Sequence, residues 1–274
     1  MKRILILGGS GFIGHALYKE FSPYFNTYGT YYSDKKFKNN QQFFHFDHTQ
    51  DDIHSLLKKI RPKLIISALR GPFIDQIELH EQLIDHVEHF NCRLLFLSSS
   101  NVFDAFHNYP SYEFDKTLSE SVYGRLKISI ENSIMRMPTS KYVIARLPMV
   151  YGLHSPRVKE MEDKMHNKEA VEVFPNTIIN LISDRKLSQQ IHYIINQQLT
   201  GLFHLGSTDL ITHHEFHKRL ATKRGWNKMI FKQVYTTNDM RYIAVLPKEN
   251  KLPDHLNTSC EEVLEDSFLN QGFL

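Results

Sequence analysis

The sequence predicts an α/β fold of the Rossmann type, a doubly wound parallel sheet with a smaller C-terminal lobe. Three observations lead to this prediction. Strand-like and helix-like segments alternate over about the first 150 of the 274 residues. The apolar run Ile4-Leu5-Ile6-Leu7 leads directly into a glycine-rich turn and then into a helical pattern. Beyond Gly152 this alternation loosens, and we therefore expect a second lobe there.

The elements of the predicted sheet follow one another in order. The strands are short and rich in apolar, aromatic or β-branched residues, and we expect them at 4–7, 27–32, 43–46, 64–68, 94–97 and 142–147. The helices carry apolar residues three or four positions apart, and we expect them at 51–60, 75–90 and 121–136. Such a sheet binds its ligands at the carboxyl ends of the strands.

The turn after the first strand carries glycine at every third position. Gly8 allows a sharp exit from the strand, Gly11 lets backbone amides approach a pyrophosphate, and Gly14 lets the following helix pack closely on the sheet. The N-terminal amides of that helix would face the anion. The spacing alone also occurs in ordinary turns. Its position between a strand and a helix favours a dinucleotide-binding site.

The second half is organised less regularly. A polar stretch at 156–170 precedes short strand-like pieces, a helix at 184–198 and a strand at 201–205 that returns to the main sheet. We expect residues 1–152, with a returning segment near 184–206, to form the dinucleotide-binding domain. Residues 153–183 and 207–274 would form the smaller lobe, which we expect to bind the substrate.

Composition argues against several classes of protein. Lys and Arg number 33 against 30 acidic residues, so a net charge of +3 gives no reason to expect a nucleic-acid surface or a basic membrane anchor. No apolar stretch approaches the length that spans a membrane. Cys92 and Cys260 fit neither a disulfide framework nor a paired zinc site. We therefore expect a cytoplasmic protein, with neither a nucleic acid nor a membrane as partner.

A serine, a tyrosine and a lysine form the second chemical signal. Ser99 lies at the end of the fifth strand, and Tyr123 and Lys127 share one face of the following helix. A phenol can exchange a proton with a carbonyl oxygen, a nearby ammonium favours the phenolate, and a serine hydroxyl can orient the oxygen. The trio suits the reduction of a ketone.

The tyrosine and lysine spacing alone decides little, because it occurs four times, and only the context selects one pair. Tyr123 lies in a helix after the serine-bearing strand, whereas the others lie at a strand end or in a loop. The four pairs are Tyr31/Lys35, Tyr32/Lys36, Tyr112/Lys116 and Tyr123/Lys127.

At these residues the chain resembles the extended short-chain dehydrogenase/reductases, and among them the dTDP-4-dehydrorhamnose reductase branch, which reduces keto groups on nucleotide sugars. The similar motifs follow in the family's order and cover most of the chain. They are the glycine loop at 8–14, the strand end Leu97-Ser98-Ser99-Ser100-Asn101-Val102-Phe103-Asp104, the helix Tyr123-Gly124-Arg125-Leu126-Lys127, the strand and loop Arg146-Leu147-Pro148-Met149-Val150-Tyr151-Gly152, and Gly201-Leu202-Phe203-His204-Leu205-Gly206.

The resemblance implies roles for individual residues. Tyr123 would be the acid/base, Lys127 would hold the nicotinamide ribose and tune Tyr123, and Ser99 would bond the substrate oxygen. Asp47 holds the family's adenine-contacting position, and His48 follows it. The implied cofactor-binding residues are Gly8, Gly11, Phe12, Ile13, Gly14, Asp47, His48, Ala68, Leu69, Tyr123, Lys127 and Pro148.

The chain departs from the branch near the expected cofactor and substrate. Arg70 follows Ser67-Ala68-Leu69, where relatives usually have a small or aromatic residue. It either meets a phosphate or carboxylate of the substrate or lies on the surface beside an acid. Ser100 stands where aspartate is common, and Met149 where tryptophan is frequent. Arg70, Ser100, Asn101 and Met149 are the candidate substrate contacts.

The end of the second strand bears on the cofactor, because an acid there binds the ribose of NAD, whereas basic or hydroxyl residues accommodate a 2′-phosphate. Asp34 lies at the distance of an NAD-type acid, yet alignment of strand ends puts Tyr31 or Tyr32 there. We expect NADP(H) in preference to NAD(H), with Ser33, Lys35 and Lys36 as phosphate contacts. The alternative is that residues 34–36 form a solvated turn.

Sixteen histidines raise the question of a metal site. His213 and His217 have a spacing that zinc sites use, but no H-E-x-x-H glutamate lies between them. We expect them at the start of a helix near Thr212 and expect no metal. His80, His86 and His89 are interpreted as one polar helix face.

These observations together predict an NAD(P)H-dependent reductase of a keto nucleotide sugar, with Tyr123 protonating the oxyanion. One alternative is an epimerase or dehydratase, which keeps its cofactor through the cycle. Another is a non-catalytic NADP-binding regulatory subunit, a role that the branch resembles in the regulatory subunit of methionine adenosyltransferase. A homodimer is a hypothesis that rests on the resemblance alone.

Overall fold

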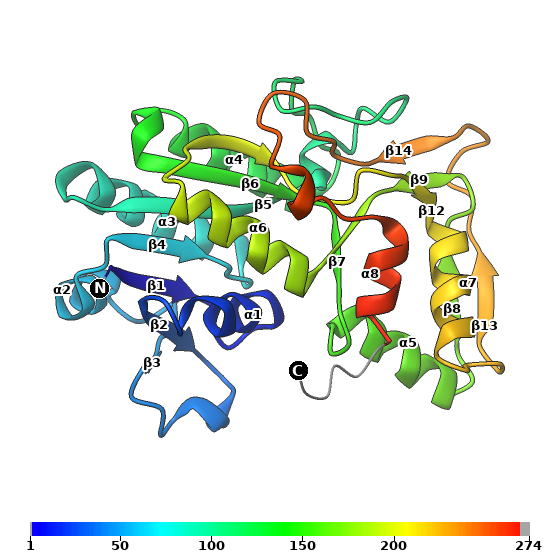
Figure 1. Cartoon of the computed structure of the whole chain (residues 1–274), viewed down its shortest axis with the longest axis horizontal. Coiled ribbons are helices and arrows are strands. Elements are labelled where there is room, and N and C mark those ends of the chain that lie inside the picture. The colour runs from blue at the N-terminus through cyan, green and yellow to red at the C-terminus, as the bar shows by residue number, and fades with distance from the viewer. Residues whose placement is uncertain (1, 269–274) are drawn as a thin grey trace.

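The computed structural model describes residues 2–268, and its main body is a seven-stranded parallel sheet with helices on both faces (Figure 1). The predicted α/β fold with a doubly wound parallel sheet is confirmed. The strand order is β11-β6-β5-β4-β1-β2-β3. The strands are β1 (Arg3–Leu7), β2 (Asn26–Tyr31), β3 (Phe43–His45), β4 (Leu64–Ser67), β5 (Arg93–Ser99), β6 (Tyr142–Leu147) and β11 (Gly201–His204).

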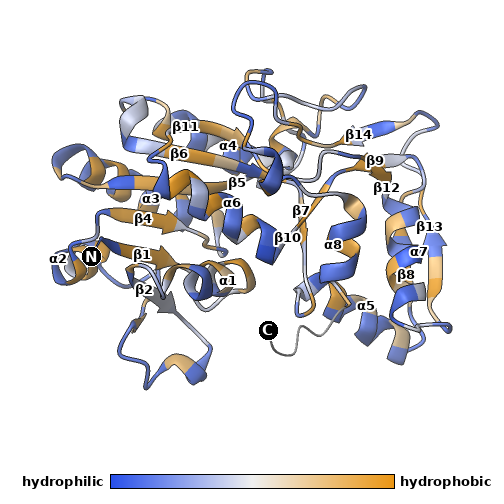
Figure 2. Ribbon diagram, in the orientation of Figure 1, coloured by the Kyte–Doolittle hydropathy of each residue, from blue (hydrophilic) through white to orange (hydrophobic). Residues whose placement is uncertain are grey.

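Side chains of β1 alternate between two cores, as the period of a strand requires. Leu5 and Leu7 face the core beneath α2, α3 and α4, whereas Ile4 and Ile6 face the core beneath α1 and α6. Figure 2 shows the apolar residues concentrated in the central strands. The helices of this body are α1 (Phe12–Phe21), α2 (Ile53–Ile60), α3 (Phe73–His89), α4 (Val122–Ile134) and α6 (Asp184–Asn196).

The chain reverses its direction of travel across the sheet at β1. After β1 it builds β2 and β3 on one side, then crosses back so that β4 pairs with β1 on the other, with Leu7 opposite Ser67. Ligands of such sheets bind in the crevice at this switch point, outside the carboxyl ends of the strands. The fold therefore places a binding crevice beside Gly8, which follows β1.

A smaller lobe packs beside the sheet, at the right of Figure 1. It has its own apolar core, built around Tyr151, Phe216 and Val263. Its helices are α5 (Pro156–His166), α7 (His213–Lys223) and α8 (Cys260–Asp266). Its strands pair as β7 (Met149–Tyr151) with β10 (Leu181–Ser183), β8 (Ala170–Val173) with β13 (Ile230–Gln233), and β9 (Thr177–Ile179) with both β12 (Ile211–Thr212) and β14 (Arg241–Ile243).

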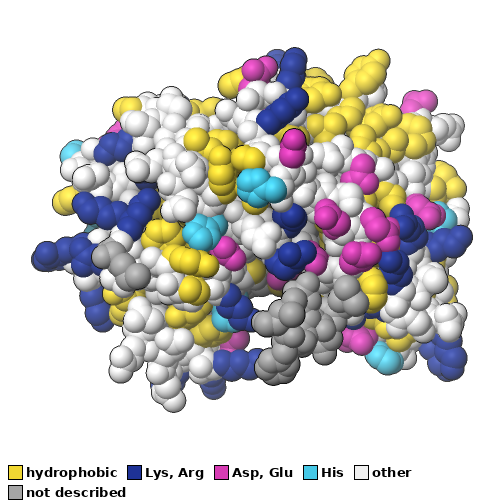
Figure 3. Space-filling view, viewed as in Figure 1, with side chains coloured by type: hydrophobic (Ala, Val, Ile, Leu, Met, Phe, Trp, Pro, Cys, Tyr) yellow, Lys and Arg dark blue, Asp and Glu magenta, His cyan; other side chains and the backbone are white. Residues whose placement is uncertain are grey.

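Ion pairs cross the surface of the smaller lobe. Glu261 on α8 pairs with Arg219 and Lys223 on α7. Figure 3 shows acidic and basic side chains interspersed on the face over these helices. Within residues 2–268, no helix combines the length and apolar character needed to cross a membrane.

Candidate active site

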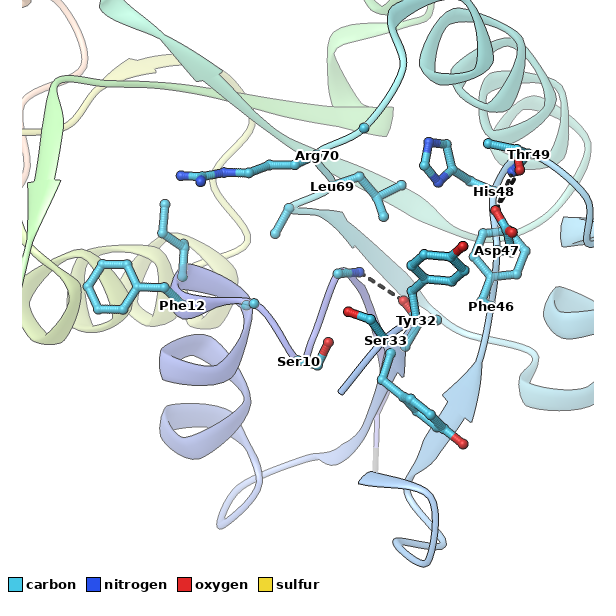
Figure 4. Close-up of a pocket in the computed structure, with 18 of the residues that line it drawn as sticks. Ser10, Phe12, Tyr32, Ser33, Phe46, Asp47, His48, Thr49, Leu69 and Arg70 are labelled. Carbon is cyan, nitrogen blue, oxygen red and sulfur yellow. Dashed lines mark hydrogen bonds between the residues drawn. The ribbon is translucent and has the colours of Figure 1, made fainter. Parts of the chain in front are cut away.

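A cavity of about 630 Å³ opens at the carboxyl ends of β1 to β4 (Figure 4). It reaches from the glycine loop to the loop after β4, and Pro156 at the start of α5 closes it on the side of the small lobe. Of the residues proposed from sequence, it is lined by Gly8, Gly11, Phe12, Ile13, Gly14, Ser33, Asp47, His48, Ala68, Leu69 and Arg70. Tyr31 and Tyr32, which the alignment of strand ends puts at the cofactor ribose, also line it. Sequence reasoning missed Ser10, Thr30, Phe46, Thr49, Gly71, Pro72 and Pro156.

The glycine loop has the shape that close approach to a ligand requires. Gly8 adopts a φ of +79°, and its amide donates to the Thr30 hydroxyl at 2.8 Å. A Cβ on Gly14 would lie 2.2 Å from the Gly8 carbonyl oxygen, so only glycine lets α1 begin here. Gly11 caps α1 without a side chain, which leaves the first turn of the helix open to the cavity. A helix N-terminus of this kind favours an anion.

The end of β2 contributes aromatic and hydroxyl groups to the cavity. Tyr31, Tyr32 and Ser33 line it, whereas Lys35 and Lys36 lie in an exposed 3₁₀ turn and do not. Asp34 caps that turn by accepting the amide of Lys36 at 3.1 Å. Of the three proposed phosphate contacts, only Ser33 therefore faces the cavity in this structure.

Asp47 and His48 lie at the opposite wall, after β3. The Asp47 carboxylate accepts the Thr49 hydroxyl at 2.7 Å and the Thr49 amide at 3.0 Å. The hydrogen bond from the hydroxyl is the main reason that the pKa of Asp47 is lowered. The Nε2 atom of His48 is buried without a partner among the described residues. This wall is thus polar and anionic.

The structure brings Ser99, Tyr123 and Lys127 together where β5 ends and α4 begins. Ser99 is half-buried, and its hydroxyl bonds with Oδ1 of Asn101 at 3.1 Å. The Lys127 Nζ lies 5.6 Å from the centre of the Tyr123 ring and donates to the Leu97 carbonyl at 3.0 Å. Close packing at Gly124 makes this possible, because a Cβ there would lie 2.4 Å from the Asn101 carbonyl oxygen.

Burial and neighbouring charges tune the trio. Burial lowers the pKa of Lys127 to about 8, and the charge of Arg70 adds to that effect while Glu131 opposes it. Partial desolvation raises the pKa of Tyr123, and Arg70, Ser99 and Arg157 oppose the rise. At neutral pH the phenol is therefore a proton donor, with a cationic lysine one helical turn away.

A buried polar network lies directly behind the trio. Glu131 and Arg146 form a buried ion pair at 2.7 Å, and Ser98 donates to Glu131. Arg146 also donates to the Glu113 carbonyl at 2.9 Å and to Nε2 of His204 at 3.3 Å. Sequence reasoning missed these roles. The sequence feature that could have revealed the network is the position of Glu131, four residues after Lys127 on the same face of α4.

The remaining substrate candidates occupy different surroundings. Arg70 is exposed, and Figure 4 shows its side chain reaching across the cavity on the side of Phe12, away from Asp47. Asn101 bonds to Ser99, whereas Ser100 is buried and Met149 is half-buried in β7. Pro148, assigned to the cofactor, is buried between β6 and β7 and does not line the cavity.

The histidines of α3 do not share one polar face. His80 was expected on a polar helix face with His86 and His89, and this was wrong. His80 is 2% exposed, and its Nε2 bonds the Ser67 hydroxyl at 2.9 Å beneath the sheet. The helical spacing predicted that His80 lies on α3, but it did not show that the face of α3 that carries His80 packs against the sheet.

His213 and His217 begin α7 and stack with ring centres 4.0 Å apart. The Nδ1 of His217 donates to the His213 carbonyl at 2.7 Å, and its Nε2 accepts the Tyr151 hydroxyl at 3.0 Å. Both nitrogens of His217 thus have protein partners. No group of metal-ligating side chains occurs among residues 2–268.

Solved structures of similar fold include nucleotide-sugar enzymes. dTDP-4-dehydrorhamnose reductase of Bacillus anthracis, in complex with NADP, superposes with a TM-score of 0.76 at 22% identity and covers 98% of this chain and 99% of its own. dTDP-glucose 4,6-dehydratase of the same organism, in complex with NAD, gives a TM-score of 0.79 at 13% identity and covers 98% and 96%. At these identities the likeness shows a common fold.

Relatives and a family model add a sequence match. The chain is 25% identical over 245 residues to methionine adenosyltransferase 2 subunit beta of Mus musculus, covering 80% of this chain and 71% of the mouse protein. The Danio rerio protein is 23% identical over 244 residues, covering 80% and 73%. The model of the RmlD substrate binding domain matches residues 1–255. The chain therefore belongs to the RmlD substrate-binding-domain family.

Proposed function

We propose that this protein is an NAD(P)-dependent oxidoreductase of the short-chain dehydrogenase/reductase type that reduces a keto group on a nucleotide sugar. The observation that carries the proposal is the convergence of Ser99, Tyr123 and Lys127 at the end of β5. None of the three lines the dinucleotide-sized cavity, but β5 pairs with β4, whose end opens into it. The family and the nucleotide-sugar enzymes of the same fold support it.

The cavity suits a nicotinamide dinucleotide. A Cβ at Gly14 has no room, and the first turn of α1 lines the cavity, as a pyrophosphate site requires. No acidic side chain from the end of β2 lines the cavity in the described part of the chain, because Asp34 caps a turn instead. This favours NADP(H) over NAD(H), with Ser33 as the nearest hydroxyl contact.

The bound reduced cofactor would supply a hydride to the carbonyl carbon. Tyr123 would donate its phenol proton to the carbonyl oxygen, and the Ser99 hydroxyl would orient that oxygen. Lys127 would hold the cofactor ribose and, as an ammonium, stabilise the phenolate that remains on Tyr123. Water would then return the proton to Tyr123.

The first test is Tyr123→Phe. We expect NADPH oxidation with a keto nucleotide sugar, followed at 340 nm, to fall by about 10²–10⁴-fold, because the general acid is removed. NADPH affinity should stay within about threefold, because the variant keeps the aromatic ring and the other cofactor contacts and loses only one hydroxyl. The matched control is Tyr112→Phe, which alters a half-exposed tyrosine of the same Y-x-x-x-K spacing in a loop and should keep full activity. Full turnover by Tyr123→Phe would rule out the mechanism.

A second candidate function is a dinucleotide-binding regulatory subunit, because the curated relatives are subunits of methionine adenosyltransferase. Under this alternative the protein binds NADP(H), reduces no keto sugar and co-purifies with a partner enzyme. An epimerase or dehydratase would instead convert a nucleotide sugar without net consumption of NADPH. The 340 nm assay and analysis of the sugar product separate the three functions.

A further inference from the structure

A second cavity lies in the loop that joins the end of β5 to α4. Its volume is about 360 Å³, and all of its lining residues fall between positions 103 and 116. Among residues 2–268, none of them also lines the larger cavity beside the glycine loop. Cavities that bind small ligands begin at about 300 Å³. The loop therefore encloses enough space for a separate small molecule.

The loop is rich in aromatic residues. Phe103, Phe106, Tyr109 and Tyr112 recur at every third position, and Phe114 follows. Phe106 and Tyr109 line the cavity, and they are 44% and 79% exposed. Figure 3 shows hydrophobic side chains gathered at the upper right, over the loops beside β14. A concentration of exposed apolar side chains in one place is typical of a binding surface.

Backbone hydrogen bonds to the small lobe hold the loop in place. The Tyr242 amide donates to the His107 carbonyl at 2.7 Å, and the Ser111 amide donates to the Ala244 carbonyl at 2.9 Å. His107 and Ser111 both line the cavity. The cavity is thus formed before a ligand arrives, which lowers the entropic cost of binding.

Two polar side chains of the cavity have groups without partners. The Nδ1 atom of His107 is buried and has no hydrogen-bond partner in the described part of the chain. Lys116 is exposed, and within residues 2–268 it forms no salt bridge. The neighbouring Asp115 also lines the cavity, and its carboxylate accepts the Tyr112 amide at 2.7 Å. A buried ring nitrogen requires a hydrogen bond, and a free ammonium can bind a phosphate.

We propose that this cavity binds a nucleoside monophosphate, at a site separate from the cofactor and the reacting groups. The base stacks on the exposed rings of Phe106 and Tyr109, because every base offers an aromatic face. Its polar edge supplies the hydrogen bond that His107 lacks, and its phosphate lies on Lys116. The proposal goes beyond the proposed function and does not depend on it.

The test is calorimetric titration of the protein, both free and saturated with NADP⁺. The probes are AMP and UMP, the nucleosides adenosine and uridine, which lack the phosphate, and ribose 5-phosphate, which lacks the base. The variants are Tyr109→Ala and Lys116→Ala. The matched control is Tyr24→Ala, which removes a 58% exposed tyrosine outside the loop. Thermal unfolding checks that each variant is folded.

We expect AMP or UMP to bind more tightly than ribose 5-phosphate, with or without NADP⁺. Tyr109→Ala should weaken the nucleotide about tenfold or more, because one stacking face is lost. Lys116→Ala should weaken the nucleotide about tenfold and leave the matching nucleoside unchanged, because only the phosphate contact is lost. Tyr24→Ala should bind as the wild type does.

Three results would overturn the proposal. The first is that neither nucleotide binds more tightly than ribose 5-phosphate. The second is that Tyr109→Ala or Lys116→Ala binds the nucleotide as the wild type does. The third is that NADP⁺ displaces the nucleotide, which would place it in the larger cavity. Because no turnover is measured, failure of the reductase function would show separately in the 340 nm assay.

Discussion

At the scale of single residues, two glycines of the first turn have different roles: one is needed for packing of the fold and the other for binding of the ligand. Gly14 lies inside the protein, where a Cβ would be 2.2 Å from the Gly8 carbonyl oxygen. Gly11 is exposed at the cavity, and the nearest atom to an added Cβ there is 3.3 Å away. The same substitution at the two positions should therefore have different consequences.

We predict that Gly11→Ala keeps the free energy of unfolding within about 0.5 kcal/mol but lowers NADPH affinity about tenfold or more, because its methyl group occupies the space that the pyrophosphate needs. Gly14→Ala should destabilise the protein by about 1–3 kcal/mol through overpacking. Urea unfolding and NADPH titration measure the two effects. Unchanged affinity in Gly11→Ala would contradict the assignment of the pyrophosphate site.

The sequence predicted most of the segments that line the cavity, but not the direction in which the side chains after β2 point. Three segments expected to bind the cofactor do line the cavity. They are the glycine loop, the strand end at Asp47 and the turn at Ala68-Leu69. Lys35 and Lys36 do not, since Asp34 starts a 3₁₀ turn that carries them away. Helices and strands leave a periodic pattern of apolar residues in the sequence. A short capped turn depends on one local hydrogen bond and leaves no such pattern, so the sequence does not reveal it.

At the scale of elements, α4 is attached to the sheet by a buried ionic network. Glu131 bonds Ser98 on β5 and Arg146 on β6, and Arg146 reaches His204 on β11. Glu113 extends the network, since its carboxylate accepts the backbone amides of residues 248 to 250. The helix that carries Tyr123 and Lys127 is thereby fixed to three strands and a C-terminal segment.

We predict that Glu131→Gln destabilises the protein by about 3–5 kcal/mol, because Arg146 is left as a buried charge without its partner. The matched control is Glu261→Gln, which breaks the two surface ion pairs of Glu261 and should cost about 1 kcal/mol or less. Chemical unfolding of both variants measures the difference. Equal costs would mean that the network does not anchor α4.

Elements with a clear apolar period were predicted within a few residues, as α2 and β6 show. The helix α5 was missed, although Ser155 caps it and Pro156 occupies its first position. Only Val158 and Met161 of that helix are buried, so its apolar stripe is too narrow to stand out. The formation of α5 depends on contacts with the rest of the small lobe, and the local sequence pattern does not indicate such contacts.

At the scale of the whole molecule, four buried histidines are held neutral. Burial lowers the pKa of His80, His204 and His217 to about 4 and that of His213 to about 3. Two belong to the main body and two to the small lobe. In the unfolded chain they bind protons below about pH 6.5, whereas in the folded protein they do so only at much lower pH.

We therefore predict that stability is retained above about pH 6.5 and is lost as pH falls toward 4, since the unfolded state then binds more protons. Each histidine contributes up to about 1.4 kcal/mol per pH unit across this window. Urea unfolding at pH 7 and pH 5 measures the loss. His217→Gln should have a shallower pH dependence than the wild type, and a slope that is unchanged would contradict the buried neutral state of His217.

The most direct test of the proposed reductase function is transfer of deuterium from NADPH, labelled at the transferable C4 position, to a panel of keto nucleotide sugars, measured by mass spectrometry. We expect one product that gains a single deuterium on the former carbonyl carbon, with consumption of an equal amount of NADPH. NADPH binding with no deuterium in any sugar, alongside a co-purifying partner enzyme, would contradict a reductase and identify a regulatory subunit.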